Sequence, residues 1–145
     1  MKTILYATDY SETSQYALHF ASLLARDNSA RLLIVHVSET EWYPVGELCH
    51  DEPELDPRPR KRLESVVPDD PSVPFQHRMV YPIPTSENVH PAAEIVQIAK
   101  EENADAIVIG THGRTGLSRL LVGSVAESVM RQAPCSVVMI KKPNP

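Results

Sequence analysis

The chain has 145 residues and a mass of 16.1 kDa, with 42% hydrophobic and 23% charged residues, which indicates one folded domain, 1–145, and excludes a disordered chain. Fourteen Lys and Arg against nineteen Asp and Glu give a net charge of −5, so bulk electrostatics do not favour nucleic acid as a partner.

Cysteine usage and hydropathy bear on the cellular location. Cys49 and Cys135 are too few for a disulfide framework or a zinc site, and they suggest a reducing compartment. No apolar run has the length needed to cross a membrane, and the opening run meets Asp9 too early for a signal peptide. We therefore expect a cytoplasmic protein without a membrane partner.

Strand-like apolar runs alternate with helical periodicities along the chain. The predicted elements are, in chain order, a strand at 3–7, a helix at 11–26, a strand at 31–37, a short helix at 58–67, a strand at 75–81, a helix at 90–102, a strand at 104–110, a helix at 125–132 and a strand at 135–141. This alternation predicts a parallel sheet covered by helices. Ligands of such sheets bind beyond the carboxyl ends of the strands.

A glycine-rich window follows the predicted strand at 104–110. Gly110, Gly113, Gly116 and Gly123 fall within fourteen residues, and Gly123-Ser124 opens the next predicted helix. Backbone amides at a helix start bind anions, and Arg114 and Arg119 in the window add positive charge. The window therefore predicts a phosphate site, although no P-loop sequence is present and glycines that only shape a turn are the alternative.

The spacing Gly110-x2-Gly113-x9-Gly123-Ser124 resembles the nucleotide motif of the universal stress protein family, in its ATP-binding branch. Segments at 4–11, 32–37 and 94–110 also resemble that family, in the same order. The resemblance implies an α/β fold of the adenine nucleotide α-hydrolase-like type, with an open five-stranded parallel sheet in the order 3-2-1-4-5 and helices on both faces.

The resemblance also implies a set of ligand contacts. Asp9 would bind the ribose or base edge, Val37 would hold adenine through its main chain, and the helix start would bind phosphates. The nucleotide-binding residues carried over are Ala7, Thr8, Asp9, Val37, Ile109, Gly110, His112, Gly113, Arg114, Gly123, Ser124 and Val125. The expected ligand is ATP, with Mg²⁺ held by phosphates and water because the window contains no carboxylate. No residue is predicted to be catalytic or to bind a metal directly.

Two further expectations concern assembly and the middle of the chain. The resemblance implies a homodimer formed through the last strand, 135–141, and pairing would cover its apolar edge. Ten of the thirteen prolines lie in the middle third of the chain, so the span 39–74 is predicted to be an irregular region in place of the family's long second helix.

Several residues have a purely structural alternative. Asp9 or Ser11 is expected to cap the first helix, which competes with ligand binding by Asp9. His112 is either a turn residue or a phosphate contact, and His36 is interpreted as a core histidine. The pair Cys49–His50 is interpreted as part of a solvated loop, and the basic cluster 58–62 as the exposed face of a short helix.

Three functions remain open at this point. The first is an ATP-binding stress-response regulator that works as a nucleotide-dependent switch with little or no hydrolysis. The second is a slow ATPase or nucleotidyl transferase on the same fold. The third is an interaction module that binds no nucleotide.

Overall fold

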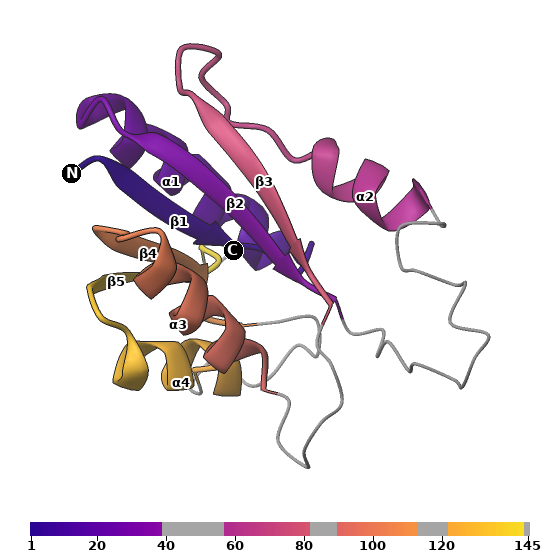
Figure 1. Cartoon of the computed structure of the whole chain (residues 1–145), viewed down its shortest axis with the longest axis vertical. Helices are drawn as coiled ribbons and strands as arrows, with labels where there is room; N and C mark the ends of the chain where they lie inside the picture. The colour runs from indigo at the N-terminus through magenta and orange to yellow at the C-terminus, as the bar shows by residue number, and fades with distance from the viewer. Residues whose placement is uncertain (39–56, 82–89, 113–121, 144–145) are drawn as a thin grey trace.

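The computed structural model describes residues 1–38, 57–81, 90–112 and 122–143. Helices and strands alternate through these ranges (Figure 1). The elements are β1 (Thr3–Ala7), α1 (Glu12–Asp27), β2 (Arg31–Val37), α2 (Pro57–Glu64), β3 (Phe75–Val80), α3 (Pro91–Glu101), β4 (Ala106–Gly110), α4 (Ser124–Gln132) and β5 (Ser136–Ile140). Every predicted element is present, with ends that differ by a few residues.

The five strands form one parallel sheet in the order β3-β2-β1-β4-β5, which confirms the predicted topology. β1 lies at the centre, where Ile4 pairs with Leu32 of β2 on one side and with Ala106 of β4 on the other. All five residues of β1 are buried, as expected for an interior parallel strand covered on both faces.

Alternate residues of each strand enter two separate cores. Leu5 and Ala7 of β1 face one core, built with α3 and α4, whereas Ile4 and Tyr6 face the other, built with α1 and α2. This alternation follows from the two-residue period of a strand. Figure 1 shows α3 and α4 together beside β4 and β5, and α2 next to β3 at the opposite edge.

The turn from β1 into α1 is fixed by two short polar side chains. Ser11 is the N-cap of α1, and its hydroxyl accepts a hydrogen bond from the Ser14 amide at 3.2 Å. Asp9 accepts a bond from the Ser11 amide at 2.9 Å and so forms the turn that precedes the cap. Of the two predicted caps, Ser11 is therefore the one used.

The helix α2 is only eight residues long, and two prolines lie in its first turn. Leu63 is its buried residue and packs into the core shared with α1. Residues 39–56, including Cys49 and His50, lie outside the described residues, so the irregular region 39–74 and the single-domain division of 1–145 stay predictions. Among the described helices, none has both the length and the apolar character required of a membrane span.

Candidate functional site

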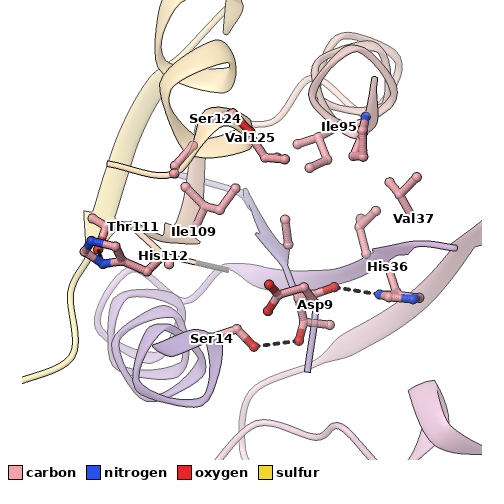
Figure 2. A pocket seen from close by; sticks show the side chains of 17 residues that line it. Asp9, Ser14, His36, Val37, Ile95, Ile109, Thr111, His112, Ser124 and Val125 are labelled. Atoms are coloured by element: carbon pink, nitrogen blue, oxygen red, sulfur yellow. Dashed lines mark hydrogen bonds between the residues drawn. The ribbon is translucent and has the colours of Figure 1, made fainter. Parts of the chain in front are cut away.

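A pocket opens where β1, β2 and β4 end, at the carboxyl edge of the sheet (Figure 2). Its volume is about 270 Å³. The lining comes from the strand ends, the first turns of three helices and the segment after β4: Ala7, Thr8, Asp9, Ser14, Val35, His36, Val37, Pro91, Ile95, Ile109, Gly110, Thr111, His112, Gly123, Ser124, Val125 and Ala126.

The structure brings together ten of the twelve predicted nucleotide-binding residues in this one pocket. The ten are Ala7, Thr8, Asp9, Val37, Ile109, Gly110, His112, Gly123, Ser124 and Val125. The other two, Gly113 and Arg114, lie outside the described residues. That these residues bind a ligand stays a prediction, but their convergence places them within reach of a single molecule.

Hydrogen bonds hold the end of β1 rigidly at the pocket floor. The Thr8 amide donates to the Val35 carbonyl at 2.9 Å, and the Thr8 hydroxyl lies 2.8 Å from the Ser14 hydroxyl. The ring of His36 donates from Nδ1 to the Thr8 carbonyl at 2.7 Å, which fixes the hydrogen on Nδ1 because a carbonyl can only accept. The backbone that carries Asp9 therefore has little freedom to move.

A buried hydroxyl supports this floor from below. Tyr6 of β1 is 1% exposed, and its hydroxyl donates to the Ser14 carbonyl at 2.6 Å. Burial raises the pKa of Tyr6, against a smaller opposing effect of its hydrogen bonds, so the phenol stays neutral. The Tyr6–Ser14 bond ties α1 to the central strand directly beneath the pocket.

The start of α4 supplies hydrogen-bond donors to the opposite wall. Its N-cap, Gly123, has no side chain to bond the first-turn amides, and the Gly123 amide donates to the Thr111 carbonyl. The first intrahelical bond runs from the Glu127 amide to the Gly123 carbonyl at 3.0 Å, so the amides of residues 124–126 precede the helical ladder. Together with the helix dipole, such amides favour a bound anion.

The end of β2 presents main-chain groups to the same pocket. The Ser38 amide bonds the Val80 carbonyl of β3, and the Thr8 amide bonds the Val35 carbonyl. Because main-chain groups point to alternate sides along a strand, the amide and carbonyl of Val37 face the β1 side, beyond the last ladder bond of β1. Val37 can therefore offer one donor and one acceptor to a planar ligand edge.

Apolar side chains form the remaining walls. In Figure 2, Ser124, Val125 and Ile95 lie across the pocket from Asp9 and His36, and Ile109 lies between them. Such walls suit a flat aromatic group, whereas the uncapped α4 start suits an anion. The pocket as a whole fits a ligand that carries both.

His112 is held by its neighbour. Its Nδ1 lies 2.9 Å from the Thr111 hydroxyl, so it has an orienting partner that the sequence does not reveal. Its Nε2 is buried and has no hydrogen-bond partner within the described part of the chain. In Figure 2 the ring lies beside Thr111 and away from Asp9.

Sequence reasoning missed several lining residues, of which Ser14 and His36 carry the most polar chemistry. The interpretation of His36 as a core histidine is wrong, since its side chain is half-buried and lines the pocket. Its position at the end of β2 was the available signal, because ligands bind at strand ends. Ser14 has no comparable signal, since it faces the pocket only through the angle at which α1 leaves β1.

No group of three or more His, Cys, Asp or Glu side chains that could hold a metal ion occurs within the described ranges. Asp9 is the carboxylate that lines the pocket there, and it already accepts a bond from the Ser11 amide. A divalent ion in this pocket would take its other ligands from a bound molecule and from water.

The strand order and the pocket at the carboxyl edge define an α/β protein with an open, doubly wound parallel sheet and a pocket at its topological switch point, where ligands of such sheets bind. The profile of the Universal stress protein family matches residues 1–141. The chain therefore belongs to the universal stress protein family.

Individual relatives agree with this assignment. Universal stress protein MJ0531 of Methanocaldococcus jannaschii is 32% identical over 98% of this chain and 83% of its own length. The solved structure of MJ0577 from the same organism is 30% identical, with a TM-score of 0.80 over 99% of this chain and 98% of that one.

Two structures with the same fold were solved with nucleotides bound. A universal stress protein from Archaeoglobus fulgidus in complex with dAMP is 24% identical, with a TM-score of 0.62 over 97% of this chain and 98% of that one. A universal stress protein in complex with cAMP is 22% identical, with a TM-score of 0.62 over 98% of each chain.

Proposed function

We propose that this protein is a cytoplasmic, ATP-binding stress-response regulator that works as a nucleotide-dependent switch with little or no hydrolysis. The observation that carries the proposal is the pocket itself, which joins main-chain groups at Val37, a carboxylate at Asp9 and an uncapped helix start at Gly123. These three features match, in order, a base, a ribose and a phosphate chain.

Each part of the nucleotide has a suitable partner in the pocket. The main-chain donor and acceptor of Val37 suit the edge of adenine, and the carboxylate of Asp9 suits ribose hydroxyls. The amides at the start of α4 and the Ser124 hydroxyl suit the phosphates. Mg²⁺, if bound with ATP, would be held by phosphates and water and would neutralise part of the phosphate charge.

Two observations on this chain favour slow hydrolysis, and a third favours nucleotide binding. The sequence lacks a P-loop lysine, and one oxygen of the Asp9 carboxylate accepts a hydrogen bond from the Ser11 amide. In addition, two relatives of the same fold were solved with the adenine nucleotides dAMP and cAMP.

Calorimetric titration of the purified protein with ATP, ADP, AMP, adenosine and GTP tests the binding. We expect saturable binding of ATP, weaker binding of adenosine because it lacks the anion, and weak binding of GTP because its base edge reverses the donor and acceptor. Absence of heat and of thermal stabilisation with ATP would favour the interaction module. Sustained turnover of ATP with Mg²⁺ would favour the slow ATPase or transferase instead.

The α4 start is tested by substitutions at Gly123, whose backbone has φ −60° and ψ 151° and accepts any residue. Gly123→Asp places a carboxylate on the first-turn amides, where it caps the helix and repels phosphate. We expect a stability equal to or above that of the wild type and ATP affinity reduced at least roughly 100-fold, from the loss of about 3 kcal/mol of charge-assisted hydrogen bonding.

Gly123→Asn is the matched control, because it caps the helix with the same shape and no charge. We expect this variant to lose less ATP affinity than Gly123→Asp and to bind adenosine as the wild type does. Unchanged ATP affinity in both variants would remove the α4 start from the phosphate site.

A further inference from the structure

Tyr10, next to Asp9 in the chain, combines two unfavourable features. Its backbone is left-handed, with φ 64°, a conformation that bulky residues rarely adopt. Its hydroxyl is buried and has no hydrogen-bond partner within the described ranges. Burial raises the pKa of this phenol, so the buried group is neutral. Such features persist where the surroundings enforce them, and they gather at functional sites.

Two flat groups enforce the position of the Tyr10 ring. The guanidinium carbon of Arg62, on α2, lies 4.0 Å from the ring centroid, and the centroid of the His36 ring lies 4.3 Å from it. The tyrosine ring therefore contacts a flat group of α2 and a flat group of the pocket wall. The order Arg62–Tyr10–His36 thus runs from α2 to the pocket wall.

We call Arg62, Tyr10 and His36 the stack. Its two members nearest the pocket, Tyr10 and His36, are both hydrogen-bonded to Thr8 at the pocket floor. The Tyr10 amide donates to the Thr8 hydroxyl at 3.0 Å, and His36 donates to the Thr8 carbonyl at 2.7 Å. Asp9 lies between Thr8 and Tyr10 in the chain and lines the pocket with Thr8 and His36. None of the described pocket-lining residues belongs to α2, so α2 reaches the pocket through Tyr10 rather than by direct contact.

We propose that Tyr10 is a positioning residue that couples the docking of α2, through Arg62, to nucleotide affinity, by holding Asp9 and His36 in their binding geometry. The inference rests on the proposed function and names α2 as the element that senses an occupied pocket. Because such coupling is reciprocal, a bound nucleotide stabilises the docking of α2 to the same extent that docked α2 raises nucleotide affinity.

Calorimetry with ATP on three variants of α2 tests whether the docking of this helix affects nucleotide affinity. Arg62→Ala removes the cation from the ring, and we expect roughly 3- to 30-fold weaker binding. Arg62→Lys keeps a cation and is expected to be intermediate. Lys61→Ala, on the same helix, removes the same charge from another face and is expected to bind ATP as the wild type does.

Substitutions at Tyr10 separate positioning from packing. Tyr10→Gly accepts the left-handed backbone without strain, so its melting temperature is expected to stay close to that of the wild type while its ATP affinity falls at least roughly tenfold through loss of the ring. Tyr10→Phe keeps the stack and removes the unpartnered hydroxyl, so its affinity is expected within about twofold of wild type. A purely structural role would lower stability and leave affinity unchanged.

Hydrogen exchange tests whether bound ATP stabilises the docking of α2. ATP is expected to slow amide exchange in residues 57–64 of the wild type and of Tyr10→Phe, and to have no such effect in Arg62→Ala at saturating ATP. Wild-type ATP affinity in both Arg62→Ala and Tyr10→Gly, or protection of α2 by ATP in Arg62→Ala, would overturn the coupling and leave the proposed function standing. Failure of the wild type to bind ATP would overturn both.

Discussion

Gly110 closes β4 where the strand passes under the first turn of α1. A Cβ at this position would lie 3.0 Å from Cγ2 of Thr13 and 3.4 Å from the Ser14 amide nitrogen. We expect Gly110→Ala to push α1 away from the sheet and to lower the free energy of unfolding by about 1–3 kcal/mol, measured by urea denaturation.

A second substitution should relieve this close contact. Thr13→Ser removes the methyl group that the new Cβ meets, so the double variant should be more stable than the sum of the two single effects predicts. Strict additivity of the two substitutions, or wild-type stability of Gly110→Ala alone, would contradict the close approach.

At the level of single residues, the sequence identified the pocket through its glycines and strand ends rather than through its polar side chains. Gly110 and Gly123 are informative because a missing Cβ has few uses other than a turn or a close approach. Ser14 and Tyr10 could not be recognised in the same way. Their roles depend on the left-handed turn at Tyr10, which no local pattern of a tyrosine predicts.

Among the elements, β5 is one of the two edge strands of the sheet. Within the described residues it pairs only with β4, and none of its residues is fully buried although four of the five are apolar. Since the Ile140 carbonyl bonds the Thr111 amide on the β4 side, alternation directs the main-chain groups of Val137 and Met139 outward. This edge is suited to pair with a second copy of the chain, as in the homodimer that the family resemblance leads us to expect.

The proposed homodimer is tested at Val138, which is 36% exposed. In a two-fold dimer, Val138→Lys places two new charges near the axis, so we expect the dimer dissociation constant to rise by roughly thirtyfold, or about 2 kcal/mol. Sedimentation velocity measures the change. Gln132→Lys on α4 adds the same charge away from the strand and should leave the assembly unchanged, whereas a wild-type protein that is already monomeric would contradict the dimer.

Most helices and strands were predictable because their apolar residues recur with a clear period. α1 shows why their limits were less certain, since Asp9 and Ser11 are both good caps and only the geometry of the turn selects Ser11. The helix at 58–67 was predicted too long because periodicity does not report where the chain must turn toward β3. His36 was misread because an apolar strand run indicates burial without indicating that its last residues leave the core.

For the molecule as a whole, Asp105 joins the start of β4 to the start of β1. Its carboxylate accepts bonds from the Lys2 amide at 2.6 Å and the Thr3 amide at 2.9 Å. These backbone bonds, that of Thr3 foremost, hold the pKa of Asp105 below its ordinary value. A carboxyl group whose pKa is lowered by folding stabilises the fold above its unfolded pKa and loses that effect as the pH falls through its folded pKa.

We therefore expect the free energy of unfolding to decrease as the pH falls below about 4, as measured by urea midpoints across the acid range. Asp105→Asn should be less stable than the wild type at neutral pH and should show a shallower decrease in acid. Some acid dependence should remain, because hydrogen bonds also lower the pKa values of Asp70 and Glu101. Parallel acid profiles for the two proteins would exclude a contribution from Asp105.

The central place of β1 has a consequence for synthesis on the ribosome. β1 is translated before both of its partners, and β4 begins only at Ala106, so one side of the innermost strand stays unpaired until about a hundred further residues have been made. Until then we expect β1, β2 and β3 to expose an unpaired apolar edge, a feature that favours aggregation of incomplete chains. α4 is translated after β4. We therefore expect a newly made molecule to bind its ligand only once α4, which carries the amides proposed to bind phosphate, has left the exit tunnel.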